Sequence, residues 1–204
     1  CQRSRRPQRP SAVPCQYARP VGHLQVSDVG FVLGDGRRLL RDVAFKVGAG
    51  ERVALVGPNG TGKTTLARVV TGDIPPSEGT VSVTGSLGVM RQFVGHMASG
   101  TLRDLLLAVA PPALAEAAAA VDASQLAMMD SEDEATQMRY AHAISDWAEL
   151  GGYELEVVWD VVAVAALGTP FARAQYRDLA TLSGGEQKRI VLEALLRGPD
   201  EVLL

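Results

Sequence analysis

In the first part of the chain, apolar positions occur in short runs that predict β-strands. The runs 24–33 and 38–47 have β-like composition and are separated by a Gly-Asp-Gly turn. Two more strands are expected at 80–83 and 87–90, on either side of Gly85. The second run shows the partial alternation of a strand with one buried face, through Leu39, Val43, Phe45 and Val47.

A different pattern occurs at 52–57, where RVALVG is a short and nearly continuous apolar run. Such a run is typical of a strand that is buried on both faces of a sheet. A helix is expected to begin near Lys63 and to end by Gly72. Another apolar strand is predicted at 201–204, and we expect it to lie beside the strand 52–57.

From about 101 to 180 the periodicity is almost entirely helical. Gly151-Gly152 separates two helices, and the segment 167–170 (LGTP) closes the second with a glycine followed by a proline. Helical spacing gives each of these helices one apolar face, formed by Tyr140, Ile144 and Trp147 in the first and by Val157, Val161 and Val164 in the second. The order of elements predicts an α/β core that carries a helical subdomain at about 97–180.

Composition adds a contrast between the two ends of the chain. The 204 residues are 47% apolar and carry a net charge of −3, and no apolar run reaches the roughly 18–20 residues of a membrane-spanning helix. Residues 28–204 hold 15 basic and 23 acidic residues, whereas residues 1–27 hold five arginines and no acid. We expect a cytoplasmic protein with no direct membrane insertion.

Residues 1–22 are predicted to form a disordered basic tail, because arginine and proline dominate them. A nucleic-acid-binding arm is one interpretation. A non-native extension is the other, since the chain begins with Cys1 instead of methionine. Cys1 and Cys15 are the only cysteines and both lie in the tail, so we expect neither a disulfide framework nor a zinc site.

The segment GPNGTGKTT at 57–65 has the spacing of a phosphate-binding P-loop and lies between a predicted strand and a predicted helix. Glycines let backbone N–H groups turn toward phosphate oxygens, and the helix N-terminus adds partial positive charge. Lys63 is expected to bridge the β- and γ-phosphates, and Thr64 to ligate Mg²⁺. The predicted ATP-binding residues are Gly57, Pro58, Asn59, Gly60, Thr61, Gly62, Lys63, Thr64 and Thr65.

A second glycine pair occurs in LSGGEQKR at 182–189, at the start of a predicted helix that Ser183 can cap. At this point the sequence resembles the ATP-binding cassette (ABC) family over roughly residues 24–204. The 57–65 segment resembles its Walker A motif and LSGGEQKR its signature. Gln92 resembles its Q-loop glutamine. The resemblance makes Gln92 a candidate Mg²⁺ ligand and, together with Lys63, a candidate catalytic residue. The fold class implied is a P-loop NTPase of ABC type, with an antiparallel β subdomain and an inserted α-helical subdomain.

The resemblance also implies what the remaining residues do. RGPDEVLL at 197–204 is similar to the approach to the Walker B strand, so 23–204 is expected to be a partial domain. The Walker B Asp, catalytic Glu and switch His would lie beyond it, and we expect this part alone to be inactive. An aromatic residue usually stacks on the adenine; Phe31 is the candidate, although another register places Leu33 there. In the family the signature acts in trans on the nucleotide of a second cassette, through Ser183, Gly184, Gly185 and Glu186.

The type of cassette is predicted from the 90-residue interval between Gln92 and Leu182. The segment 147–168 and its link to the signature resemble the first cassette of ABC-F proteins, which are soluble and act on the ribosome. This resemblance implies an ATPase whose partners are a second cassette and the ribosome or its RNA, in translation or antibiotic resistance. The alternatives are the ATP-binding subunit of a membrane transporter, with a transmembrane permease as partner, and a DNA-repair-type ABC ATPase.

Overall fold

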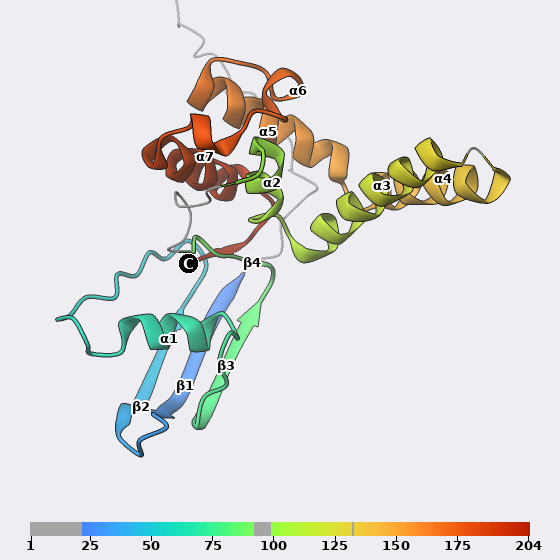
Figure 1. Ribbon diagram of the computed structural model, residues 1–204. Helices are drawn as coiled ribbons and strands as arrows, with labels where there is room; N and C mark the ends of the chain where they lie inside the picture. The colour runs from blue at the N-terminus through green and yellow to red at the C-terminus, as the bar shows by residue number, and fades with distance from the viewer. Residues whose placement is uncertain (1–21, 92–98, 132) are drawn as a thin grey trace, which may run out of the picture.

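Three antiparallel strands form a sheet at one end of the molecule, in the order β2-β1-β3 (Figure 1). The computed structural model describes residues 22–91, 99–131 and 133–204. The strands are β1 (His23–Val32), β2 (Arg38–Val47) and β3 (Glu78–Thr84). Each was predicted from its apolar pattern, and each is confirmed.

Helix α1 (Lys63–Val70) lies across one face of this sheet (Figure 1). In the register of the sheet, Leu24 of β1 faces Val47 on one side and Val83 on the other. Aligned apolar positions of this kind give the sheet one continuous apolar face. That face and α1 form one hydrophobic cluster, whose buried members are Leu24, Val26, Val29, Leu40, Leu66, Val69 and Val70.

The alternation predicted for β2 is wrong at one position. Leu40 is buried, whereas Leu39 is only partly buried. Asp42 has a positive φ of 49°, and the pairing of β1 with β2 changes register between Val29 and Phe31. An irregularity of one residue reverses which face of a strand each later side chain occupies. The alternation of inward-facing residues before Asp42 is therefore shifted by one relative to the alternation after it.

Helices make up most of the second half of the chain, as predicted. Trp159 lies at the centre of their core, with its ring centroid 6.5 Å from that of Trp147 and 5.3 Å from that of Phe171. The helical elements are α2 (Leu102–Leu107), α3 (Pro112–Asp130), α4 (Glu134–Glu149), α5 (Gly152–Leu167), α6 (Phe171–Ala174), the 3₁₀ turn η1 (Leu179–Thr181) and α7 (Gly184–Arg197). None of the helices in the described ranges is both long and apolar enough to cross a membrane.

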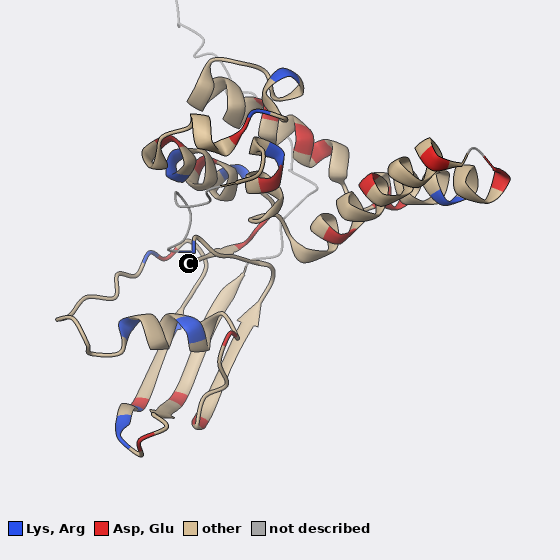
Figure 2. Cartoon of the chain, in the orientation of Figure 1, with Lys and Arg blue, Asp and Glu red and all other residues tan. Residues whose placement is uncertain are grey.

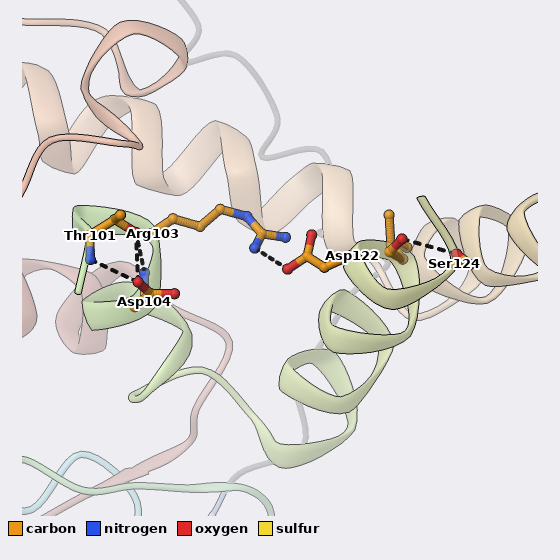
Figure 3. A network of polar contacts seen from close by, with 6 residues as sticks. Thr101, Arg103, Asp104, Asp122 and Ser124 are labelled. Atoms are coloured by element: carbon orange, nitrogen blue, oxygen red, sulfur yellow. Dashed lines mark hydrogen bonds and ion pairs between the residues drawn. The ribbon is translucent and has the colours of Figure 1, made fainter. Parts of the chain in front are cut away.

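Helices α3 and α4 form a hairpin that projects from the rest of the helices (Figure 1). Leu114 and Ala118 on α3 and Trp147 on α4 join the helical core, so only the base of the hairpin is packed against it. Arg103 of α2 reaches across to α3, where its Nη1 lies 2.6 Å from a carboxylate oxygen of Asp122 (Figure 3). The Arg103 side chain is only 18% exposed but that of Asp122 is 53% exposed, so this ion pair is shielded from solvent on the arginine side alone.

The expected placement of two strands is wrong. Residues 52–57 form no strand ladder within the described part of the chain, and Val53, Leu55 and Val56 are 65%, 55% and 83% exposed. The short strand β5 (Val202–Leu203) pairs in parallel with β4 (Leu87–Gly88), and not with 52–57. A cavity of about 750 Å³ is lined both by residues 52–55 and by β5. An apolar run is held as a buried strand only where a neighbouring strand pairs with its backbone, and here β5 pairs with β4 instead.

Candidate nucleotide-binding site

The P-loop connects the extended segment 52–57 to the first turn of α1. Gly57, Gly60 and Gly62 all have positive φ values, of 158°, 82° and 93°. Non-glycine residues rarely adopt such values at Gly60 and Gly62, so the curvature of the loop depends on these two positions. The loop predicted from the glycine pattern is therefore present, although the strand predicted before it is not formed.

Gly62 is required for a second reason, which the sequence did not reveal. A Cβ built on Gly62 would lie 2.9 Å from Cδ2 of Leu40 and 3.2 Å from Cγ of Leu39. The start of α1 thus packs directly on β2, and the glycine allows the approach. By contrast, a Cβ on Gly60 would meet no described atom within 4 Å.

Lys63 directs its ammonium group into the loop. Its Nζ donates to the carbonyl oxygens of Gly57 at 2.8 Å and of Pro58 at 2.6 Å, and the Thr61 hydroxyl also donates to Pro58 O at 2.9 Å. The first N–H groups of a helix have no acceptor within the helix, so those of α1 add further donors at the same end. Charged ammonium and backbone N–H donors together suit a polyphosphate.

These donors fit a nucleoside triphosphate with its metal ion. The Thr64 and Thr65 hydroxyls follow Lys63 in the first turn of α1, where a phosphate-bound Mg²⁺ would meet an oxygen ligand. Gln92, the other predicted metal ligand, lies outside the described residues. Phe31 is partly buried and packs against the sheet cluster, opposite Leu40. Its role in adenine stacking stays a prediction.

The signature segment forms the capped N-terminus of α7. The Ser183 Oγ accepts from the Glu186 N–H at 3.2 Å, while Glu186 Oε2 accepts from the Ser183 hydroxyl and from the Ser183 N–H, each at 2.7 Å. This reciprocal arrangement is a capping box. The hydrogen bonds from the Ser183 side chain and backbone hold the pKa of Glu186 below its ordinary value. Gly185 is open, since among the described residues a Cβ there would meet only Ser183 Oγ, at 4.0 Å.

Sequence reasoning missed Gln187, which holds the approach to the signature. Its side chain is buried, and Nε2 donates to the carbonyl oxygen of Leu179 at 3.0 Å and of Leu182 at 3.5 Å. The 3₁₀ turn before Ser183 is thereby tied to α7. The signal was available: Gln187 shares the apolar face of α7 with Ile190, Val191 and Ala194 at helical spacing, and a polar residue at a core position needs a specific partner.

The P-loop and the signature do not belong to one hydrophobic cluster. The P-loop is followed by α1, which packs on the sheet through Leu66, Val69 and Val70. The signature begins α7, whose Ile190, Val191 and Leu195 belong to the helical cluster. Each motif is therefore positioned by its own part of the fold.

Comparison with known families decides the class of this site. The sequence model of the ABC transporter family matches residues 40–204, which include the P-loop and the signature. The chain belongs to the ABC transporter family. It has the ATP-binding domain of that family, and its P-loop NTPase fold of ABC type is the one predicted.

Two curated relatives of this ABC domain are named for antibiotic resistance. An "Antibiotic resistance protein" of Mycobacteroides abscessus is 52% identical over 185 residues, covering 90% of this chain and 34% of the relative. The tylosin resistance ATP-binding protein TlrC of Streptomyces fradiae is 34% identical over 176 residues, covering 83% of this chain and 32% of the relative. The chain thus spans about a third of the length of these relatives.

The ABC fold is also found among solved structures. The ATP-binding subunit of an ABC transporter superposes with a TM-score of 0.55 at 20% identity, over 85% of this chain and 61% of that one. A bacterial Atm1-family ABC exporter with ATP bound gives a TM-score of 0.52 at 21% identity, over 88% of this chain and 28% of that one. At these identities the likeness concerns the fold alone.

Proposed function

We propose that this domain is the first ATP-binding and hydrolysing cassette of a soluble ABC-F type ATPase that acts on the ribosome and protects it from an antibiotic. The observation that carries the proposal is the similarity to two resistance proteins over 90% and 83% of the chain. These matches are too long to be explained by the P-loop and signature alone, so they include the helical subdomain between them. That subdomain is also where the sequence resembles ABC-F proteins.

The mechanism proposed for the site is pairing of two cassettes in a head-to-tail arrangement. Lys63, Thr64 and Gln92 would serve the nucleotide of this cassette. Ser183 and its neighbours would meet the γ-phosphate held by the second cassette. The capped end of α7 suits that role, because the helix N-terminus carries partial positive charge and Gly185 leaves its surface open.

Within this site the protein's own residues bind and orient the substrate. The P-loop donors hold the β- and γ-phosphates, and Lys63 places a positive charge among them. Bound Mg²⁺ would neutralise part of the phosphate charge beside Thr64. Closure of the two cassettes excludes water from the phosphates, which strengthens every one of these electrostatic contacts.

The experiment uses the complete gene product and purified bacterial ribosomes. Cell-free translation is inhibited with tylosin, and the protein is added with ATP. We expect protein synthesis to recover with the parent and not with Lys63→Ala, and we expect ribosomes to stimulate ATP hydrolysis. Failure of the parent both to bind ribosomes and to change translation with any tested ribosome-directed antibiotic would exclude the proposal.

The second candidate function is the ATP-binding subunit of a membrane transporter. The name of the matching family supports it. This candidate requires a transmembrane permease as partner. It would be favoured if the protein co-purified with a membrane protein in stoichiometric amounts, if that membrane protein stimulated its ATPase activity, and if ribosomes did not.

A further inference from the structure

The outward face of α5 presents an apolar ridge that the described parts of the chain leave exposed. Tyr153, Val157, Val161 and Val164, here called the α5 ridge, are 50%, 65%, 46% and 47% exposed. Their spacing of four, four and three residues places them on one side of the helix. At a rise of about 1.5 Å per residue the ridge is roughly 16 Å long. The valine face expected from the sequence is therefore present, and it faces solvent.

The ridge is not needed to bury α5. The other side of the helix contributes Leu155, Trp159, Val162 and Ala163 to the helical core. Single exposed apolar residues are ordinary on protein surfaces. Four bulky ones aligned over three helical turns form a contiguous patch, and such patches mark interaction surfaces.

Charge around the ridge restricts what can cover it. Helix α5 contains Glu154, Glu156 and Asp160 and no lysine or arginine, and Figure 2 shows the acidic residues along it. Two of these three carboxylates already interact with other parts of the fold. Asp160 accepts from the Phe171 N–H at 2.8 Å, and partial burial raises the pKa of Glu156, an effect that nearby Arg103 opposes.

The C-terminal end of the ridge has the opposite charge. Arg189 of α7 lies there, with its Nη2 3.4 Å from the carbonyl oxygen of Ala165. The ridge therefore has acidic residues beside its N-terminal part and a cation, Arg189, at its far end. The opposite charges at the two ends of the ridge would favour one orientation of a bound partner along α5.

We propose that the α5 ridge is the docking surface for a protein partner that presents an apolar helix bordered by lysine or arginine. Acidic groups beside valine side chains repel nucleic acid phosphates, and Tyr153 is the only residue of the ridge able to stack on a base. A second copy of the chain would bring acidic borders together. Basic residues along the partner helix would pair with the acidic residues beside the ridge and would steer the two surfaces together. The proposal depends neither on nucleotide binding nor on the ribosome.

The first test measures binding of a synthetic helical peptide of about 16 residues, long enough to cover the ridge. One peptide has a leucine face bordered by lysines, and its matched control has glutamates at the same borders. We expect the lysine peptide to bind the parent at least tenfold more tightly in fluorescence anisotropy, and to weaken as salt is raised from about 50 to about 300 mM. Val157→Asp and Val161→Asp should each reduce the affinity at least tenfold.

The matched protein control is Met138→Asp, because Met138 is an exposed apolar residue on α4, outside the ridge. It should leave peptide binding unchanged. Val161→Ser provides a milder ridge variant, and circular dichroism with urea unfolding checks that each variant folds like the parent. Equal loss of binding with Met138→Asp, or equal binding of the glutamate peptide, would overturn the proposal.

The second test places a photoreactive p-benzoylphenylalanine at Val161 in the complete protein in cells. We expect a cross-link that resists ribonuclease, and mass spectrometry should map it to an apolar segment flanked by basic residues. A cross-link to RNA, to a second copy or to another part of the same chain, or none at all, would overturn the proposal. A permease or ribosomal origin of the segment would separately decide between the two functions proposed above.

Discussion

The Lys63 ammonium nitrogen donates to the carbonyl oxygen of Gly57 at 2.8 Å, across the turn of the P-loop. The side chain is thus directed into the concave side of the loop and is not extended toward solvent. In the proposed site Lys63 would be the principal cation for a bound phosphate chain. We therefore expect Lys63→Ala to weaken ATP binding in the complete protein by roughly 10- to 100-fold, because hydrogen bonds to charged groups contribute about 1.5–3 kcal/mol. Titration with a fluorescent ATP analogue measures the change, and equal affinity of variant and parent would exclude the P-loop assignment.

The contact of Gly62 with Leu40 predicts different costs for two alanine substitutions in the same loop. Gly62→Ala meets both a positive φ and a close side chain, whereas Gly60→Ala meets only the positive φ. Holding an alanine in the left-handed backbone conformation costs about 1–2 kcal/mol of stability in each case. Urea unfolding should show a larger loss of stability for Gly62→Ala, and equal losses would contradict the close packing of α1 on β2.

Gln187 predicts a structural effect close to the signature. Gln187→Leu removes one of two hydrogen bonds to the carbonyl oxygen of Leu179, which still accepts from the Leu182 N–H at 3.0 Å, so the loss is about 0.5–1.5 kcal/mol. We expect the lower part of this range, because Oε1 of Gln187 has no hydrogen-bond partner in the described part of the chain and its removal is favourable. Chemical unfolding measures the loss. Lys188→Ala, an exposed neighbour, should change stability little, and a similar loss there would assign the effect to α7 in general.

The capping box predicts a pH dependence with a definite sign. Because the pKa of Glu186 is lowered in the folded state, its contribution to the free energy of unfolding is complete above the ordinary pKa of glutamate. That contribution is lost as the pH falls through the lowered value. Glu186→Gln keeps a capping side chain but does not titrate. The difference in stability between parent and variant should therefore shrink between roughly pH 6 and roughly pH 3; a difference that stays constant or grows would contradict it.

Gly185 predicts a separation between binding and pairing. In the part of the chain that the structure describes, a Cβ at Gly185 meets only Ser183 Oγ at 4.0 Å, so Gly185→Asp is expected to fold normally. In the complete protein it should leave ATP affinity at Lys63 nearly unchanged and block ATP-driven closure of the two cassettes. Ser183→Arg should block closure in the same way, although it also removes the capping box of α7. Equilibrium ATP binding and distance measurements between labelled cassettes separate the two effects, and loss of binding at the same cassette's P-loop would exclude the trans arrangement.

Local features of this chain could be predicted from sequence because short-range interactions determine them. Ser183 and Glu186 are three residues apart, and their capping box forms within one helical turn. Gly168 ends α5 in the left-handed conformation, as the LGTP segment indicates. Gly60 and Gly62 likewise set the curvature of the P-loop through their own φ values.

Pairing, burial and exposure depended on the tertiary structure. The apolar run 52–57 reads as a buried strand, yet it is exposed because β5 pairs with β4 on the other side of a cavity. The valine face of α5 has the spacing of a core face, yet it is the opposite side of the same helix, which carries Trp159, that packs in the helical core with α7. A sequence pattern identifies which positions are apolar and at what period, but a face is buried only if residues distant in the sequence come to cover it, and backbone groups are paired only if a distant strand lies at hydrogen-bonding distance.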